Sequence, residues 1–207
     1  MINRTFYCIS LAFFLLGCGQ SDQIASDNPV SRNKYPAIVI KGGRVFIDGK
    51  LLWLGDAMAV WKAAIPGTPR CSEPQLIVVC NWDELGVQIG SGQNDMTNVT
   101  YMNINLAAEE NFFLEKDDFS PKKVFRGYLE LDGMSIDSTT KYGAIRRNID
   151  PRRNMTCGIR RCTEPTAAFN SAATIHLSLK GVSDQSQLYS FSLNCKNDES
   201  CKASIPK

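Results

Sequence analysis

The chain has 207 residues, with 23 lysines and arginines, 21 aspartates and glutamates, one histidine and eight cysteines. This length fits one ordinary domain or two very small ones and excludes several full-sized domains. A formal net charge of +2 and a hydrophobic content of 43% argue against a disordered chain and against a strongly basic nucleic-acid binder. We therefore expect a globular protein that does not bind nucleic acid.

The first 17 residues are typical of a secretory signal peptide. Arg4 is followed by an apolar run, residues 6–16, that is too short to cross a bilayer as a helix. The run ends in Leu15-Leu16-Gly17-Cys18, which resembles the lipobox of bacterial lipoproteins. That resemblance implies lipidation of Cys18 and removal of residues 1–17; the alternative is an ordinary signal with a coincidental cysteine. Because Gly19 replaces the aspartate of an inner-membrane retention signal, we expect an outer-membrane lipoprotein that faces the periplasm and is held by outer-membrane lipid through its acyl chains.

Residues 18–36 are polar and contain prolines, which indicates a flexible tether between lipid and domain. The remaining chain divides into a first unit, 37–118, and a second unit with a cysteine-rich end, 119–207. Six cysteines remain in these units, an even number in an oxidising compartment. The sequence does not rank their many possible pairings, but the sequence-local ones are attractive. The expected disulfides are Cys71–Cys80, Cys157–Cys162 and Cys195–Cys201. The spacings lack the close cysteine pairs of zinc sites, so we expect no metal and no cofactor.

The first unit opens with a β-branched run at residues 37–40. Two apolar runs then flank Asp48-Gly49, which predicts a hairpin with a type I′ turn. Asp56 stands at the N-cap position of a predicted helix, 57–65. A further strand is predicted at the apolar run 76–79, and residues 87–89 are its predicted continuation or partner. Another strand is predicted at 100–106, where apolar and polar residues alternate.

The second unit repeats this order. Asp132-Gly133 again lies between apolar runs, a weaker helical pattern covers 139–148, and alternating runs predict strands at 174–179 and 188–193. The segment Arg161-Cys162-Thr163-Glu164-Pro165 repeats Arg70-Cys71-Ser72-Glu73-Pro74, which gives Cys71 and Cys162 equivalent places. We predict an α+β fold of two repeated antiparallel-sheet-plus-helix (ββαββ-like) units, stabilised by disulfides. Whether the two sheets fuse is left open.

Four segments carry a resemblance to a known family. They are residues 43–50 (GRVFIDGK), 54–61, 82–87 (WDELGV) and 103–106 (NINL). Together they resemble the lipase-immunity lipoproteins of the type VI secretion system, over roughly residues 38–149. The resemblance implies a periplasmic lipoprotein that binds and blocks a secreted antibacterial phospholipase. The cysteine-rich end beyond Pro151 does not match that family.

The residues themselves do not favour an enzyme. No G-x-S-x-G elbow follows a strand, and the glycine-containing segment 86–92 lacks the lysine of a phosphate loop. His176, the single imidazole, alternates with apolar neighbours and is expected on the outer face of a strand. Asp83 and Glu84 are expected to cap a turn. We therefore expect no catalytic activity.

Two charge clusters are candidates for partner binding. Basic residues dominate from Lys141 to Arg161, and acidic residues surround an aromatic pair in the first unit. The simplest interpretation is two solvated loops. The alternative is contact with an effector, since aromatic anchors dominate hot spots and charge steers association, or, for the basic run, with membrane headgroups. The candidate residues are Phe112, Phe113, Glu115, Asp117, Asp118, Arg146, Arg147, Arg152 and Arg153.

Three functions follow from these observations. The first is an immunity lipoprotein that binds and neutralises a type VI secretion effector of the phospholipase class. The second is a structural or envelope-assembly lipoprotein that binds another envelope protein. The third is a lipoprotein that binds a small ligand.

Overall fold

A computed structural model describes residues 35–73, 76–93, 95–107, 120–164, 173–181, 183–196 and 201. Five strands form one sheet, in the order β3 (Lys50–Leu52), β2 (Arg44–Ile47), β1 (Ala37–Lys41), β8 (Tyr128–Leu131) and β9 (Met134–Ile136). Eight strands form the other, in the order β10 (Thr156–Gly158), β11 (Arg161–Thr163), β12 (Ala173–Leu179), β13 (Leu188–Cys195), β7 (Tyr101–Asn105), β6 (Val87–Gly90), β5 (Val79–Trp82) and β4 (Arg70–Ser72).

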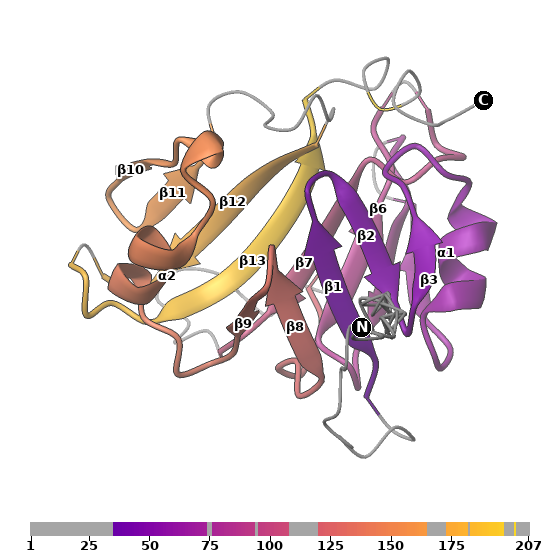
Figure 1. The fold of residues 1–207 in the computed structure, drawn as a ribbon. Coiled ribbons are helices and arrows are strands. Elements are labelled where there is room, and N and C mark those ends of the chain that lie inside the picture. Colours follow the sequence, from indigo (N-terminus) through magenta and orange to yellow (C-terminus); the bar gives the residue numbers. More distant parts are fainter. Residues whose placement is uncertain are drawn as a thin grey trace, which may run out of the picture.

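Two short helices, α1 (Met58–Ala64) and α2 (Tyr142–Asn148), lie at opposite ends of the sheets (Figure 1). A 3₁₀ turn, η1 (Pro151–Arg153), follows α2. Together with three disulfides, these elements confirm the predicted α+β class and its disulfide stabilisation. The predicted strands at 174–179 and 188–193 correspond to β12 and β13.

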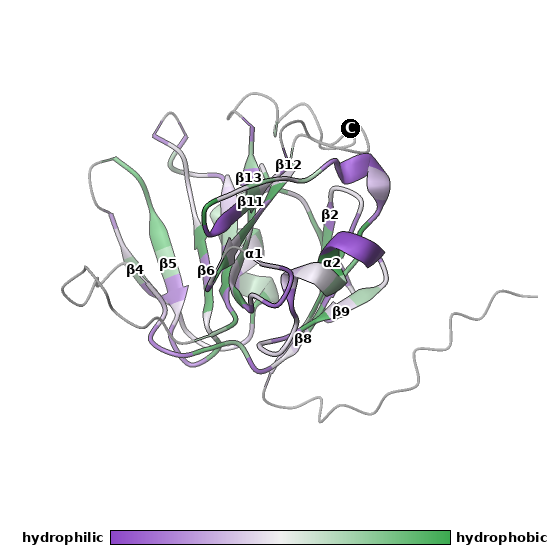
Figure 2. Cartoon of the chain, turned by 90° about the vertical axis from the view of Figure 1, so that its left-hand side faces the viewer, coloured by the Kyte–Doolittle hydropathy of each residue, from purple (hydrophilic) through white to green (hydrophobic). Residues whose placement is uncertain are grey.

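The core lies between the two sheets, because strand alternation turns one face of each sheet inward. On β1, Ile38 and Ile40 are fully buried, whereas Val39 between them is half-buried on the outer face. Figure 2 shows the two layers from the side, with β4, β5 and β6 in one and β2, β8 and β9 in the other. One continuous apolar cluster joins both sheets and both helices, the latter through Trp61 and Ile145.

The two Asp-Gly turns have the predicted type I′ character. Asp48 and Gly49 have φ values of 49° and 81°, and Asp132 and Gly133 have 49° and 89°. Each aspartate also binds one end of β1, since Asp48 accepts from the backbone of Ala37 at 2.9 Å. At the other end Asp132 accepts from the backbone of Gly42 at 2.8 Å. The repeated turns thus position the central strand of the five-stranded sheet.

The two repeated halves share both sheets, which answers the question that the sequence leaves open. β1 pairs in parallel with β8, and β7 pairs antiparallel with β13. The first half contributes three strands, β1 to β3, to the five-stranded sheet and the second half contributes two, β8 and β9, whereas each half contributes a four-stranded meander to the eight-stranded sheet. The order of elements is therefore repeated as predicted, but neither half has a sheet of its own.

All three disulfides join the predicted partners. Cys71 lies directly opposite Cys80 on β4 and β5, and Cys157 lies directly opposite Cys162 on β10 and β11. Since β4 and β10 are the two edges of the eight-stranded sheet, Cys71 corresponds to Cys157. The predicted equivalence of Cys71 with Cys162 is wrong by one strand, because the repeated Arg-Cys segment lies on the edge strand β4 in the first half and on β11, one strand inward from the edge, in the second half.

Two local predictions in the first half also differ from the structure. The strand predicted at 76–79 begins only at Val79, and Leu76 is 69% exposed with a φ of 68° in the connection before it. Asp56 does not cap α1. Its carboxylate instead accepts from the backbone of Trp53 at 2.8 Å, which leaves Ala57 at the N-cap position.

Candidate functional site

The basic run of the second half separates into exposed and buried side chains. Arg146 and Arg147 are exposed in the last turn of α2, where the helix dipole favours cations. Arg152 is exposed on η1, but its neighbour Arg153 is only 1% exposed. The prediction that Arg153 contacts a partner at the surface is therefore wrong. Its guanidinium is enclosed because it neutralises carboxylates from other parts of the chain.

Arg153 links segments that are distant in sequence. Its Nε donates to Asp132 Oδ2 at 2.6 Å, and its Nη2 donates to the carbonyl of Gly42 at 2.7 Å. Its Nη1 donates to Glu164 Oε2 at 3.3 Å, and the Glu164 side chain is 0% exposed. Glu164 also accepts from the backbone of Ile175 at 3.0 Å. Because buried charges persist only when paired and hydrogen-bonded, this network holds η1 against the β1–β2 and β8–β9 turns.

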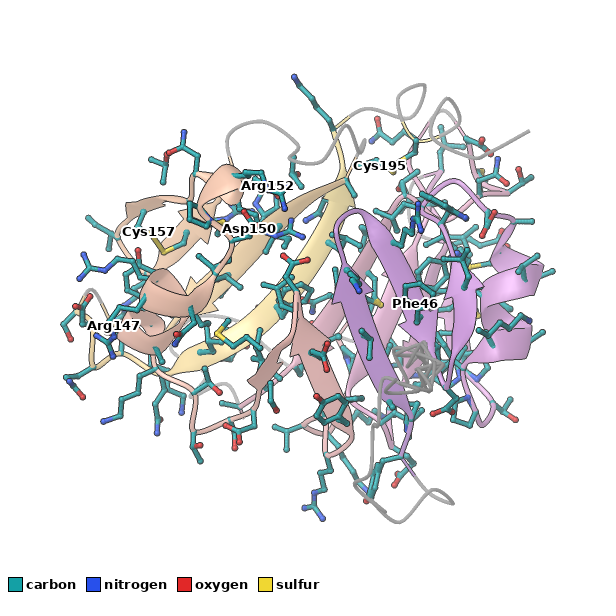
Figure 3. All side chains as sticks on the ribbon, viewed as in Figure 1. Phe46, Arg147, Asp150, Arg152, Cys157 and Cys195 are labelled. Atoms are coloured by element: carbon teal, nitrogen blue, oxygen red, sulfur yellow. A yellow bond between two sulfur atoms is a disulfide. The ribbon has the colours of Figure 1, made fainter. Side chains whose placement is uncertain are left out.

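A shallow, open pocket of about 460 Å³ lies beside this network. It forms where the β1–β2 turn meets the segment before and within η1, and most of its side chains are charged. Figure 3 shows Asp150 and Arg152 near that turn, with Phe46 on the neighbouring strand β2. The lining residues are Lys41, Gly42, Gly43, Arg44, Phe46, Asp132, Asp150 and Arg152.

The rim of this pocket is positively charged on balance. Asp150 is engaged by Arg152, whose Nη2 lies 2.6 Å from Asp150 Oδ2. The side-chain hydrogen bond from Arg152 lowers the pKa of Asp150 to about 2, so this carboxylate stays ionised and paired at neutral pH. Lys41 and Arg44 add two exposed cations to the rim. The electrostatic potential around the pocket is therefore positive.

An apolar strip continues from the pocket across the outer face of the five-stranded sheet. Val39, Phe46 and Leu51 lie side by side in the strand register, and Leu51 is 42% exposed. The guanidinium of Arg44 lies 5.6 Å from the centre of the Trp53 ring, within range of a cation–π interaction. Apolar contact area with a charged rim is the usual composition of a protein–protein interface.

The structure brings only part of the predicted site together. Arg152 joins the pocket, and Arg146 and Arg147 lie on the preceding helix, where Arg146 Nη2 is 2.6 Å from Asp184 Oδ2. The acidic and aromatic candidates and the lipidation site lie outside the described residues. These are Phe112, Phe113, Glu115, Asp117, Asp118 and Cys18.

Asp83 and Glu84 lie in a turn, as predicted, but their carboxylates bind residues outside it instead of capping it. Asp83 Oδ2 lies 3.0 Å from Arg70 Nε, and Glu84 Oε2 lies 2.5 Å from Lys123 Nζ. The hydrogen bond from Arg70 is the main cause that holds the pKa of Asp83 below its usual value, with a smaller contribution from the backbone of Lys122. These partners tie the β5–β6 turn to β4 and to the segment before β8.

His176 lies on the outer face of β12, as predicted, and is half-buried. Its Nδ1 is 3.3 Å from Nη2 of Arg161 on β11, and its Nε2 is 3.3 Å from the hydroxyl of Thr174. Burial, and secondarily the charge of Arg161, lowers the pKa of His176 below 6.5. The imidazole is therefore mainly neutral at pH 7.

Sequence reasoning missed Lys41, Arg44 and Phe46 as members of the pocket. No local signal marks them, because only the parallel pairing of β1 with β8 brings this turn to η1. The sequence does single out Glu164, because this residue belongs to the repeated Arg-Cys segment. Its counterpart in that segment, Glu73, is exposed, so the repeat alone does not indicate burial.

Among the described residues, no helix is long and apolar enough to span a bilayer. Nor does the described part of the chain gather three histidine, cysteine or acidic side chains in a metal-binding arrangement.

Comparison with known proteins gives one match. No curated protein and no solved structure matches the chain. A family model covers residues 37–146, which is more than half of the chain and runs from β1 into α2. The matched segment therefore crosses the predicted boundary between the units at residue 118. The chain belongs to the family described as a domain of unknown function, DUF7738.

Proposed function

We propose that this chain is an immunity lipoprotein that faces the periplasm and neutralises a type VI secretion effector of the phospholipase class. The observation that carries the proposal is the surface around the pocket. There, the β1–β2 turn and η1, which carry the cations, are held together by the buried Arg153 network, next to an apolar strip. Fixed charges steer association with an oppositely charged partner, and a pre-organised surface loses less entropy on binding.

The expected anchor agrees with this function. A lipidated Cys18 would tether the domain through residues 19–36, and a flexible chain of that length has a root-mean-square extent of roughly 25 Å. A phospholipase acts at the bilayer, so such a tether would keep the inhibitor close to the surface that its target attacks. A Cys18→Ala variant is expected to bind effector in solution but to protect cells less well.

The direct test examines the genes beside the one that encodes this chain and takes a phospholipase toxin encoded there as the candidate effector. Periplasmic expression of that toxin should kill cells, and co-expression of the chain should restore growth. Isothermal titration calorimetry on the purified pair should show a one-to-one complex whose affinity falls as salt is raised, because screening weakens charge complementarity.

Charge-reversal variants test which surface of the chain binds the effector. The combined variant Arg146→Glu, Arg147→Glu and Arg152→Glu should weaken binding by roughly tenfold or more. The matched control is Lys62→Glu, because Lys62 stands at the fifth position of α1 as Arg146 does in α2, and both are exposed. The control should bind like the unaltered chain.

The binding and protection results distinguish the immunity function from the envelope-assembly function. If the chain neither binds nor protects against the neighbouring toxin, the immunity proposal fails. Stable binding to an envelope protein without protection from any toxin would support the structural or envelope-assembly function instead.

A further inference from the structure

Both edges of the eight-stranded sheet end in hairpins that are closed by a disulfide. One is β4–β5, where Cys71 pairs with Cys80, and the other is β10–β11, where Cys157 pairs with Cys162. In each hairpin the cysteine on the edge strand is exposed and the cysteine on the inner strand is fully buried. The disulfide therefore ties an exposed edge to the core.

Each hairpin presents a large aliphatic side chain to solvent. Leu76 is 69% exposed in the β4–β5 connection, and Ile159 is 85% exposed in the β10–β11 turn. The two differ in charge, because Arg160 and Arg161 follow Ile159 and both are exposed, whereas the β4–β5 connection begins with the acidic Glu73. Of these two hairpins, as far as the structure describes them, only β10–β11 combines an exposed aliphatic side chain with flanking cations.

The β10–β11 hairpin is held in place by contacts to two other elements, β12 and α2. The carbonyl of Arg160 accepts from the backbone of Leu179 on β12 at 2.8 Å. Arg161 lies 3.3 Å from His176, also on β12. The hydroxyl of Tyr142 on α2 lies 2.6 Å from Sγ of Cys157. The tip is thus positioned before any partner arrives.

The backbone of the tip is also unusual for its sequence. Arg160 has a φ of 57°, in the left-handed region where glycine is favoured over other residues. The chain nevertheless places a guanidinium there, next to an isoleucine that gains nothing from the protein's own core. A strained residue beside an exposed anchor is the combination expected at a contact surface.

We propose that this tip, Ile159 with Arg160 and Arg161, inserts into an apolar pocket of the effector whose rim carries carboxylates. The inference rests on the proposed function, that the chain binds an effector, and adds which element enters it. Insertion removes the exposed isoleucine from water, and the arginines pair with the rim carboxylates. Because the disulfide and the β12 contacts already order the tip, little conformational entropy is lost on binding. The tip lies beyond residue 146, outside the segment that the family model covers.

The test compares two single variants of the whole mature chain by calorimetry against the neighbouring toxin. Ile159→Asp should weaken binding by at least roughly tenfold, since it places a carboxylate in the apolar pocket near other carboxylates. Leu76→Asp is the matched control, because Leu76 is also an exposed aliphatic side chain on a disulfide-closed hairpin, and the affinity of this variant should stay within about threefold of the unaltered chain. Both side chains project into solvent, so urea midpoints should be unchanged.

The results also distinguish this inference from the proposed function. If the unaltered chain does not bind the toxin, the proposed function itself fails. If the unaltered chain binds but Ile159→Asp binds equally well, or if both variants lose affinity equally, the tip is not the inserting element and only this inference is overturned.

Discussion

Arg152 and Arg153 show how far two adjacent arginines can differ in role. The side chain of Arg152 is 70% exposed and pairs with Asp150 at the pocket rim, whereas that of Arg153 is 1% exposed and binds two carboxylates and a carbonyl. The turn η1 directs the two side chains to opposite sides, so one belongs to the surface and the other to the interior. The stability of the protein should depend on the second.

We predict that Arg153→Ala lowers the free energy of unfolding by about 3–5 kcal/mol, because it leaves the buried Glu164 and the partly buried Asp132 without their cationic partner. Arg152→Ala, the adjacent control, should cost less than about 1 kcal/mol, since exposed ion pairs contribute little. Urea unfolding followed by tryptophan fluorescence measures both. Equal losses in the two variants would show that the buried network does not stabilise the fold.

His176 makes the stability of the fold depend on pH in a range where few other groups titrate. Its pKa in the folded state lies below 6.5, mainly through burial, so the unfolded chain takes up a proton first as pH falls. The stability should therefore be complete above pH 6.5 and fall as the pH decreases below that value. Urea unfolding at pH 7.5 and pH 5.5 should show this loss, and His176→Gln should reduce it. An identical pH dependence in the variant would rule out this histidine as the source.

At the scale of elements, the hairpins are the units that the chain repeats. The two Asp-Gly turns each bind one end of β1, and the two disulfide-closed hairpins form the edges of the larger sheet. The Asp-Gly turns depend on local backbone conformation alone, since a Cβ on Gly49 or Gly133 would meet no atom within 4 Å. Their glycines are required for φ and not for space.

We predict that Gly49→Ala and Gly133→Ala each destabilise the protein by about 1–2 kcal/mol, the cost of a left-handed conformation for a residue with a Cβ. Gly158→Ala on β10 is the control, because its Cβ would also meet no atom and its φ is not in the left-handed region. It should change stability by less than about 0.5 kcal/mol. Thermal unfolding of the three variants checks this, and an equal loss at Gly158 would contradict the conformational explanation.

At the scale of the whole molecule, the two halves are interleaved. Residues 37–118 contain three strands of the five-stranded sheet and four of the eight-stranded sheet, and the central pairings β1–β8 and β7–β13 join them to the other half. The apolar cluster is continuous across both halves. The predicted boundary at residue 118 therefore separates repeated sequences, but the resulting fragments do not have separate cores.

We predict that neither 37–118 nor 119–207 folds alone, because each fragment would expose an unpaired strand and half of the common core. Each should lack a cooperative unfolding transition in circular dichroism, while the chain 19–207 unfolds in one transition. A fragment with a cooperative transition of its own would show that the repeated units are independent domains.

The sequence by itself was enough to predict the α+β class, the two type I′ turns, both helices and the three disulfide pairs, because these depend on residues close together in the chain. It could not place Arg153 in the interior, since Asp132, Glu164 and Gly42 reach it only after the sheets form. It also assigned equivalent places to Cys71 and Cys162, which lie on an edge strand and on an inner strand, because strand order is decided only when the sheet forms.

The pocket is another feature that the tertiary structure decides and the sequence does not predict. Its cations are separated in sequence by more than a hundred residues, and only the parallel pairing of β1 with β8 places Lys41 and Arg44 near Arg152. Local patterns of turn residues, alternation and cysteine spacing act over a few residues and are visible in the sequence. Burial, strand order and the joining of distant charges depend on packing between the sheets, and only the tertiary structure decided them.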